Sequence, residues 1–407
     1  MEAVPTLDAA QRVGVLGAGT MGAGIVQVVA EAGVEVIVHD PLPGAYERAK
    51  QRISGFIRRR AEKGQLDDEA AALAVARIGE AGSIEELATA DLVIEAIPEE
   101  LDLKRDAFAR LDAAAGPRAI LATNTSSLSV ARIAAATRRP ERVVGMHFFN
   151  PVPLMALVEV VAGPLTAPLT VDAIAIFARR LGKTPVVAAD TPGFIVNRVA
   201  RPFYLEALRI LGDGEAGVEA IDEAMRAIGF RMGPFELIDA IGADVNLAVS
   251  ESVHEQLFFD PRYRPHQIQR MLVDAGRLGH KSGGGFYEYG SDGARTVPWA
   301  VLARRPEGPR PDRLTAEQIT ARILAVIVNE AASAVAEGVA SPHAVDTAMR
   351  LGTNYPSGPF EWGERIGLAH VVRTLDGLHA RVPDGRYRVV PLLRTVVERG
   401  GSFTEDR

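Results

Sequence analysis

The chain has 407 residues, of which 45 are lysine or arginine and 52 are aspartate or glutamate, so its formal net charge is −7. This acidic balance argues against non-specific binding to nucleic acid, which requires a net basic surface. The absence of cysteine from the sequence excludes disulfides and thiolate metal sites, and no other metal site is predicted.

A chain of this length with 47% hydrophobic residues is expected to form two or three domains. Its first half alternates nearly all-apolar runs with stretches whose apolar residues recur at helical spacing. Strands covered by helices on both faces are apolar throughout, so the alternation predicts βαβ units in a Rossmann-type, doubly wound α/β sheet. The predicted strands are 13–16, 34–40, 92–97, 120–122, 143–146, 157–161 and 185–187, and the predicted helices are 21–32, 45–63, 101–115 and 171–181.

From about residue 190 onward the pattern is helical, beginning with one long predicted helix at 195–211. Residues 291–313 contain four prolines together with glycines and arginines, which is typical of a linker. Three short blocks recur in this half, in the same order and at nearly the same spacing. They are EA at 206–207 and 330–331, IDEAM and VDTAM at 221–225 and 345–349, and GPFE at 233–236 and 358–361. The sequence therefore predicts two copies of one all-α domain, with domain ranges 1–189, 190–296 and 297–407.

Gly17, Gly19 and Gly22 form a GxGxxG motif between the first predicted strand and its helix. In this context Gly17 permits the tight turn, Gly19 lets the backbone approach a pyrophosphate, and Gly22 lets the helix pack on the strand. The helix start at Thr20 and Met21 offers N–H groups and a partial positive charge to phosphates. The motif alone also fits an ordinary glycine-rich turn, but the strand, the helix and the acid that follows predict dinucleotide binding.

Asp40 is that acid, at the end of the second predicted strand and twenty-three residues after Gly17. A carboxylate at this place accepts hydrogen bonds from the adenosine ribose and repels the 2′-phosphate of NADP. Asp40 therefore predicts NAD as the cofactor. The alternative is an acid that only starts a turn before Pro41.

His147 follows the predicted strand 143–146, at the end where a parallel sheet places its ligand crevice. Glu159 lies twelve residues on, in the next predicted strand, so neighbouring strands can bring the two side chains together. A carboxylate that holds one imidazole nitrogen stabilises the imidazolium formed when the other nitrogen takes a proton. Alcohol oxidation with NAD needs such a base. From spacing alone, a structural histidine is the commoner case.

Four runs stand in order over about residues 12–290: GAGTMGAGI, TNTSSL, HFFNPVP and DTPGFIVNR. Together they resemble the L-3-hydroxyacyl-CoA dehydrogenase (3-hydroxybutyryl-CoA dehydrogenase) family, which serves fatty-acid β-oxidation, butyrate metabolism and aromatic degradation. The resemblance implies an NAD-dependent oxidoreductase that interconverts L-3-hydroxyacyl-CoA and 3-ketoacyl-CoA.

The resemblance also implies a set of substrate-site residues. His147 is the general base for the 3-hydroxyl and Glu159 is its orienting partner. Ser126 hydrogen-bonds the reacting oxygen, and Asn150 and Asn197 position the substrate.

Further residues are assigned to the cofactor and to CoA. Glu99 and Lys104 match family positions near the nicotinamide ribose, and Asn124 is assigned to the same cofactor site. Without the family, Glu99 and Lys104 would be a solvated pair at a helix start, and Asn197 would be a helix cap. Lys63 matches a family lysine that contacts CoA, and it ends a helix rich in arginine.

The second helical copy has Ala321 where the first has Asn197, so copy two is predicted to be structural. A duplicated domain can make internally the two-fold contact that a partner subunit would otherwise supply. We therefore expect a monomer with an internal pseudo-dimer of helical domains, or a homodimer, acting on an acyl-CoA substrate.

Two other classes stay open at this stage. One is another NAD-dependent β-hydroxyacid dehydrogenase, of the 3-hydroxyisobutyrate or 6-phosphogluconate type, which would use a lysine base. The other is a crystallin-like dinucleotide-binding protein without catalysis. A fused hydratase–dehydrogenase would need a chain longer than 407 residues.

The cytoplasm is the expected location. The sequence has no uninterrupted apolar run of the roughly eighteen residues that a membrane span requires. Glu2 and Asp8 precede the first predicted strand, where there is no room for a signal peptide. The chain ends on Glu405, Asp406 and Arg407, which is not a peroxisomal address.

Overall fold

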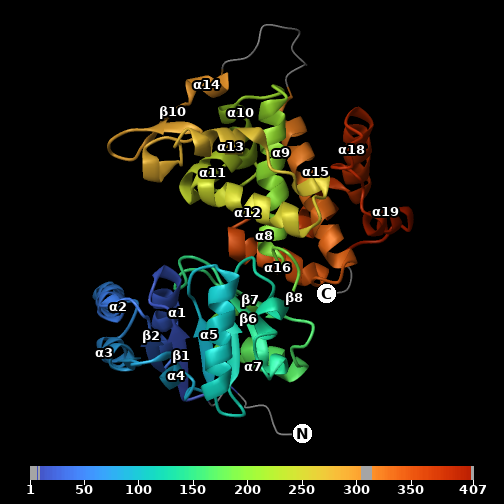
Figure 1. Cartoon of the computed structure of the whole chain (residues 1–407). Helices are drawn as coiled ribbons and strands as arrows, with labels where there is room; N and C mark the ends of the chain where they lie inside the picture. The colour runs from blue at the N-terminus through green and yellow to red at the C-terminus, as the bar shows by residue number, and fades with distance from the viewer. Residues whose placement is uncertain (1–6, 8–9, 304–313, 405–407) are drawn as a thin grey trace. The chain divides into compact units, whose positions relative to one another are not determined.

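The computed structural model describes residues 7, 10–303 and 314–404. The chain divides into two compact units, Met1–Phe194 and Ile195–Arg407 (Figure 1).

The first unit is built on an eight-stranded sheet with strand order β3-β2-β1-β4-β5-β6-β7-β8. Every neighbouring pair is parallel except β6 and β7, so β7 and β8 run opposite to the other six strands. The connection between β6 and β7 is too short to hold a crossover helix, which forces this pair to be antiparallel. The strands are β1 Arg12–Leu16, β2 Glu35–His39, β3 Ile78–Glu80, β4 Leu92–Glu95, β5 Ile120–Thr123, β6 Val143–Phe148, β7 Leu157–Ala162 and β8 Thr184–Ala189.

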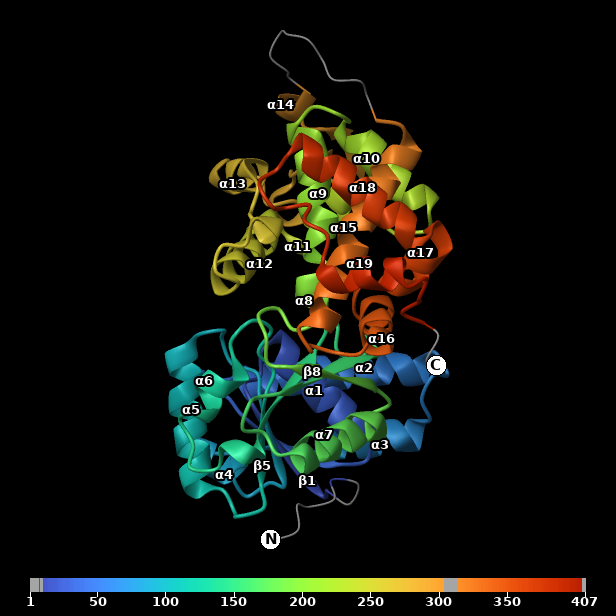
Figure 2. The ribbon, with the colours of Figure 1, turned by 90° about the vertical axis from the view of Figure 1, so that its right-hand side faces the viewer.

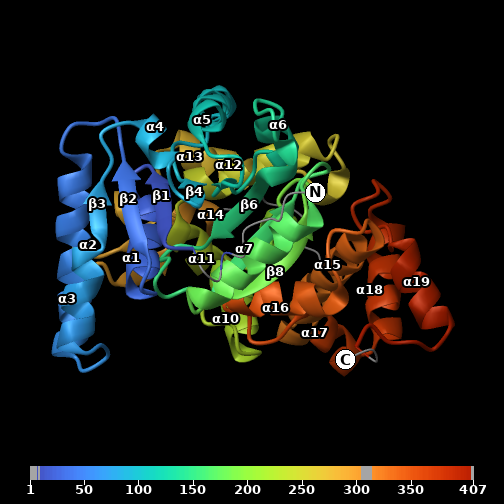
Figure 3. The same ribbon diagram turned by 90° about the horizontal axis from the view of Figure 1, so that it is seen from below.

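Helices cover both faces of this sheet, as a doubly wound fold requires. Figure 3 shows α4 (Ile84–Leu87), α5 (Leu101–Ala114) and α6 (Val130–Ala134) on one face, with α1 (Thr20–Glu31) and α7 (Pro168–Arg180) on the other. Two further helices, α2 (Ala45–Glu62) and α3 (Asp68–Ala76), pack against α1. The Rossmann-type prediction is confirmed. The short strand β3 was not predicted, because only one of its three residues is apolar.

The second unit is mainly helical. Its helices are α8 Val196–Val199, α9 Arg201–Gly212, α10 Val218–Ala227, α11 Pro234–Ile241, α12 Ala243–Gln256, α13 Gln267–Asp274, α14 Ala300–Ala303, α15 Ala316–Ala336, α16 Pro342–Thr353, α17 Pro359–Ile366, α18 Leu368–Arg381 and α19 Pro391–Glu398. A small antiparallel hairpin joins β9 (Tyr287–Tyr289) to β10 (Arg295–Pro298).

Two sequence predictions are wrong in this unit. The predicted helix 195–211 is two helices, because Pro202 lacks the amide hydrogen that would continue the hydrogen-bond ladder from α8. The predicted linker 291–313 includes β10 and α14. The prolines of this segment favoured a linker, although apolar and aromatic residues stand between them. The rest of that linker, 304–313, lies outside the described residues.

The repeated sequence blocks form the same local structure twice. Asp222 accepts hydrogen bonds from the backbone N–H groups of Phe235 and Glu236, at 2.9 and 3.1 Å, at the start of α11. In the second copy Asp346 does the same for residues 360 and 361 at the start of α17, at 2.8 and 3.2 Å. A Cβ on Gly233 would overlap the Asp222 side chain, and residue 358 is in the same position beside Asp346, which explains why glycine recurs.

The two copies share one further repeat, which sequence inspection missed. DPRYR at 260–264 recurs as DGRYR at 384–388, offset by 124 residues like Asp222 and Asp346. In both copies the first aspartate is hydrogen-bonded to the arginine two residues later.

The longest helix of the described residues, α15, packs against α9 and α10, and it lies beside α9 in both Figure 1 and Figure 2. Its apolar run 323–328 is buried, as predicted. By length and hydropathy α15 is the one helix of the described chain that could cross a membrane, but 78% of its most apolar window is buried within the structure. It is therefore a core helix.

Removing copy two tests the internal contact. A chain ending at Pro298 should expose the face of α9 that α15 covers, and it should associate or aggregate because large apolar patches rarely stay solvent-exposed. Sedimentation of the full-length and truncated proteins at equal concentration measures this. A truncated chain that stays a soluble monomer would show that copy two does not replace a partner.

Candidate functional site

The candidate site lies where β1, β4, β5 and β6 end. These strands are parallel neighbours, so their carboxyl ends meet at one edge of the sheet, where open α/β folds bind ligands. Four predicted features lie at these strand ends. The glycine motif follows β1, Glu99 follows β4, Asn124 and Ser126 follow β5, and His147 is the second-last residue of β6.

Each glycine of the motif has a distinct environment. Gly17 has φ of +103°, and a Cβ there would lie 2.6 Å from the carbonyl oxygen of Ala96. A Cβ on Gly22 would overlap the carbonyl oxygen of Gly17. Beside Gly19, in contrast, a Cβ would meet no atom within 4 Å. The protein's own packing requires the first and last glycines, whereas the space beside Gly19 is open to a ligand.

The start of α1 completes a cradle for phosphate. Gly19 is the N-cap residue and supplies no side-chain acceptor, so the first N–H groups of the helix, from Thr20 and Met21, are not capped by a side chain at that position. Such N–H groups and the helix dipole favour an anion. These residues fit the pyrophosphate of a dinucleotide.

Asp40 lies beside this loop, just after β2. Its Oδ2 accepts a hydrogen bond from the backbone N–H of Ala18 at 2.8 Å, and its Oδ1 accepts one from Leu42 at 2.9 Å. The carboxylate is thereby fixed next to the glycine loop, where the predicted contact with an adenosine ribose requires it.

His147 and Glu159 face each other across the antiparallel pair β6–β7, in direct register. The imidazole Nδ1 lies 2.7 Å from the Glu159 Oε2. His147 is 6% exposed and Glu159 is fully buried. A carboxylate accepts hydrogen bonds, so Nδ1 donates and Nε2 keeps the lone pair that can take a proton. The sequence prediction that neighbouring strands bring the two side chains together is confirmed.

Two aromatic rings pack near this imidazole, and one side-chain amide fixes the backbone beside it. The Phe149 and Phe194 rings lie 4.5 and 5.9 Å from it, centroid to centroid. Asn124 Oδ1 accepts a hydrogen bond of 2.8 Å from the backbone N–H of Phe148, which ties the end of β5 to β6 directly after His147.

Glu99 organises the loop that carries Ser126. Its Oε1 accepts hydrogen bonds from the backbone N–H groups of Ser126 and Ser127, at 2.9 and 3.1 Å, and from the Thr125 hydroxyl at 2.6 Å. Burial raises the pKa of Glu99, but the charge of Lys104 and these hydrogen bonds outweigh it, so the net effect lowers the pKa. Glu99 thus remains an acceptor that fixes the backbone of the loop that carries Ser126.

Lys104 is buried, so the alternative interpretation of Glu99 and Lys104 as a solvated surface pair is wrong. Its Nζ lies 2.6 Å from Glu95 Oε1 and 3.2 Å from Glu99 Oε2. Glu95, at the end of β4, also accepts a hydrogen bond of 2.6 Å from the Thr123 hydroxyl. Sequence inspection missed Glu95, although an acid that ends an otherwise apolar strand was a usable signal.

A cleft of about 550 Å³ opens between α1, α2 and the loop after His147. Its walls include Asn150 and Leu154 from the loop and Phe56, Arg52 and Arg60 from α2. The predicted residue Lys63 caps the end of α2 and is not among the lining residues. The cations at this cleft are therefore the two arginines.

A buried lysine outside the predicted set supports the same loop. Lys183 Nζ donates to the carbonyl oxygens of Val152 and Met155, at 2.5 and 2.8 Å. Burial lowers the pKa of Lys183. It lies just before β8 and belongs to none of the four family-like runs, so the sequence offered no signal for it.

Asn197 belongs to the second unit, in the short helix α8. Its backbone carbonyl accepts a hydrogen bond of 3.2 Å from Arg201 Nε. Its expected role beside His147 stays a prediction.

Two family models match the chain. Residues 12–191 match "3-hydroxyacyl-CoA dehydrogenase, NAD binding domain". Residues 193–289 and again 319–404 match "3-hydroxyacyl-CoA dehydrogenase, C-terminal domain", so the same model matches both helical segments.

Similar proteins agree with these matches. A 3-hydroxyadipyl-CoA dehydrogenase of Escherichia coli is 38% identical, covering 94% of this chain and 97% of the relative. A 3-hydroxybutyryl-CoA dehydrogenase of Bradyrhizobium diazoefficiens is 44% identical, covering 71% of this chain and 98% of the relative. A crystal structure of 3-hydroxybutyryl-CoA dehydrogenase from Escherichia coli is similar with a TM-score of 0.87 and 38% identity, covering 96% of this chain and 99% of that one.

The different surroundings of Gly19 and Gly22 give a paired test of the cofactor cradle. Gly19→Ala should leave the melting temperature nearly unchanged, because its Cβ meets no protein atom. It should nevertheless weaken NADH binding by about tenfold or more, because the added methyl group lies where the backbone must approach the pyrophosphate. Gly22→Ala should destabilise the fold by about 1–3 kcal/mol through overpacking. Thermal melts and NADH titrations measure both effects. Wild-type NADH affinity in the Gly19→Ala variant would show that the pyrophosphate does not bind beside residue 19.

Proposed function

The chain belongs to the 3-hydroxyacyl-CoA dehydrogenase family, and from this premise we propose that it interconverts L-3-hydroxyacyl-CoA and 3-ketoacyl-CoA with NAD⁺/NADH, using His147 as general acid and base. The observation that carries the proposal is the buried His147–Glu159 pair, at the same edge of the sheet as the glycine cradle.

In the oxidising direction, His147 Nε2 takes the proton of the substrate's 3-hydroxyl. Glu159, hydrogen-bonded to Nδ1, keeps the ring in the tautomer with a free Nε2 and balances the positive charge that the ring then carries. The glycine cradle and Asp40 would hold NAD⁺, which would supply the acceptor for the hydride lost from the substrate's 3-carbon. In the reducing direction, the imidazolium returns its proton to the ketone oxygen.

The remaining site residues position the substrate. Ser126, whose backbone is held by Glu99, would hydrogen-bond the reacting oxygen, and Asn150 and Asn197 would orient the acyl group. The apolar cleft beside α2 would accept the pantetheine arm of CoA. Arg52 would supply positive charge for the phosphates of CoA, whereas Arg60 is already paired with Glu31.

A lysine base, as in other β-hydroxyacid dehydrogenases, has less support. The two buried lysines of the described residues are both engaged. Lys104 pairs with two carboxylates, and Lys183 donates to two carbonyl groups. His147 remains the base that the geometry favours.

NADH oxidation by acetoacetyl-CoA tests the function and the base together. The wild type should turn over acetoacetyl-CoA and not free acetoacetate, which lacks the CoA handle. His147→Gln should bind NADH normally and lower kcat by about 10²- to 10⁴-fold, the usual contribution of a general base. Glu159→Gln should also lower kcat, because the ring loses its orienting charge.

Stopped-flow or steady-state absorbance of NADH gives kcat, and NADH fluorescence titration is the internal control for folding. A His147→Gln variant that keeps more than a third of wild-type kcat would remove His147 from the mechanism. Equal turnover of free acetoacetate would refute the acyl-CoA assignment.

Asp40 should set the preference for NADH over NADPH. Its fixed carboxylate beside the glycine loop should repel a 2′-phosphate. Asp40→Ala removes both the charge and its hydrogen bonds, whereas Asp40→Asn removes the charge and keeps the shape. Both variants should lower the ratio of kcat/KM for NADH to kcat/KM for NADPH. A wild type that prefers NADPH, or variants with an unchanged ratio, would contradict this role.

A further inference from the structure

A short, separate helix carries Asn197 in copy one. Pro202 ends the hydrogen-bond ladder between α8 and α9, and the equivalent position 124 residues later is Val326, within the uninterrupted helix α15. The single turn α8 has no side-chain cap, and it packs against α15 and α16 of copy two. Its orientation therefore depends on contacts with copy two.

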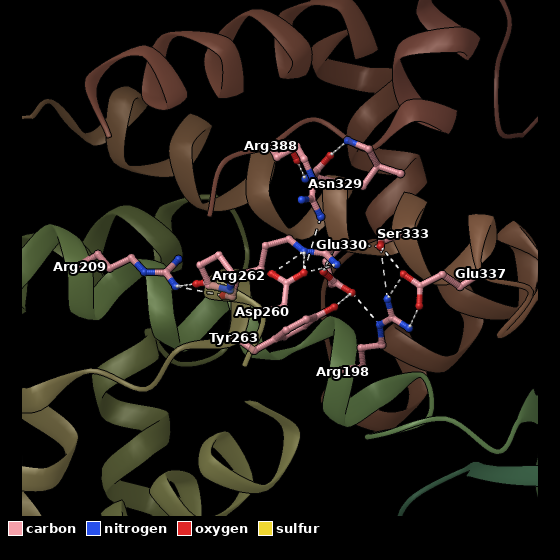
Figure 4. A network of polar contacts seen from close by, with 12 residues as sticks. Arg198, Arg209, Asp260, Arg262, Tyr263, Asn329, Glu330, Ser333, Glu337 and Arg388 are labelled. Carbon is pink, nitrogen blue, oxygen red and sulfur yellow. Dashed lines mark hydrogen bonds and ion pairs between the residues drawn. The ribbon is translucent and has the colours of Figure 1, made fainter. Parts of the chain in front are cut away.

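The strongest of these contacts is made by Arg198, the residue next to Asn197. Arg198 is fully buried, and its Nε donates to Glu330 Oε1 of α15 at 2.7 Å. Two more N–H groups of the guanidinium donate to Glu337, at 2.8 and 2.9 Å (Figure 4). Glu330 also accepts hydrogen bonds from Tyr263 and Arg262 of copy one.

The same bridge exists in the opposite direction. Arg322 of copy two donates to Glu206 of copy one, and the Tyr387 hydroxyl donates to Glu206 at 2.9 Å. The residues of the two bridges occupy equivalent positions in the two copies. Residues 198, 206 and 263 of copy one correspond to residues 322, 330 and 387 of copy two, each 124 positions later. Reciprocal pairs of this kind define a two-fold interface, here within one chain.

The two bridges differ in one respect that bears on the reaction. The residue before Arg198 is Asn197, whereas the residue before Arg322 is Ala321. Successive helix residues project about 100° apart, so fixing the direction of Arg198 also fixes the rotation of α8 and the direction of Asn197. The equivalent bridge at Glu206 fixes no substrate-facing side chain.

We propose that Glu330, in copy two, is a positioning residue for the reaction: through Arg198 it sets the orientation of α8 and thereby of Asn197 against the acyl-CoA. Copy two then contributes to turnover as well as to stability. The inference rests on the proposed role of Asn197 in substrate positioning.

The pseudo-symmetry supplies the matched control. Glu330→Gln and Glu206→Gln remove equivalent charges from equivalent bridges, so both should lower the melting temperature by similar amounts. Only Glu330→Gln should lower kcat/KM for acetoacetyl-CoA, by about tenfold, since small misplacements of a positioning group reduce rate strongly. NADH affinity should stay within about twofold of wild type in both. Equal kcat/KM values for the two variants would overturn the proposal.

A milder pair covers the case in which the glutamine variants fail to fold. Tyr263→Phe and Tyr387→Phe each remove one hydrogen bond to Glu330 or Glu206, and only Tyr263→Phe should lower kcat/KM. In an Asn197→Ala background, Glu330→Gln should cause no further loss, because both changes act through the same amide. Additive losses would contradict the proposal.

Asn197→Ala alone distinguishes the proposed role of Asn197 from the proposed role of Glu330. If it leaves kcat/KM at the wild-type value, the proposed function of Asn197 fails, and this inference fails with it. If it lowers kcat/KM while Glu330→Gln matches Glu206→Gln, only the inference fails.

Discussion

The register between β6 and β7 places His147 directly opposite Glu159, and the proposed chemistry depends on this one cross-strand pair. The connection after His147 is too short for a crossover helix, so β7 must return antiparallel and present Glu159 to the imidazole. The parallel strands before β6 bring the glycine cradle and the Ser126 loop to the same edge. Sheet topology therefore brings together the groups that are proposed to hold the cofactor, act as the base and bind the reacting oxygen.

The second unit is held by buried ion pairs exchanged between two related halves. Such pairs are sensitive to loss of one partner, since an unpaired buried charge costs about 3–5 kcal/mol. Arg198 with Glu330 and Arg322 with Glu206 must therefore be kept together. Because both halves lie in one chain, each could diverge separately, and only copy one keeps the asparagine next to its arginine. Pro202 then separates α8, the helical turn that carries Asn197, from α9.

Sequence patterns predicted the sheet, the glycine motif and the pairing of His147 with Glu159, because each depends on local periodicity or on neighbouring strands. Long-range polar contacts were not predictable in the same way. Lys183 gains its role only after it meets the carbonyl group of Val152, thirty-one residues earlier, and burial of a charged group leaves little trace in a local pattern. The break before Pro202 was visible in the sequence, but the apolar periodicity of 195–211 was given more weight. The role of Asn197 still rests on family resemblance.

The proposed chemistry requires that Glu159 holds Nδ1–H of His147 and leaves Nε2 as the base. The chain has eight histidines, so ¹⁵N-histidine NMR of the NADH-bound protein is tractable, with His147→Gln assigning the signal. Because Glu159 accepts a hydrogen bond from Nδ1, neutral His147 should carry its hydrogen on Nδ1 and have an unprotonated Nε2. A spectrum in which Nε2 carries the hydrogen and Nδ1 does not would contradict it.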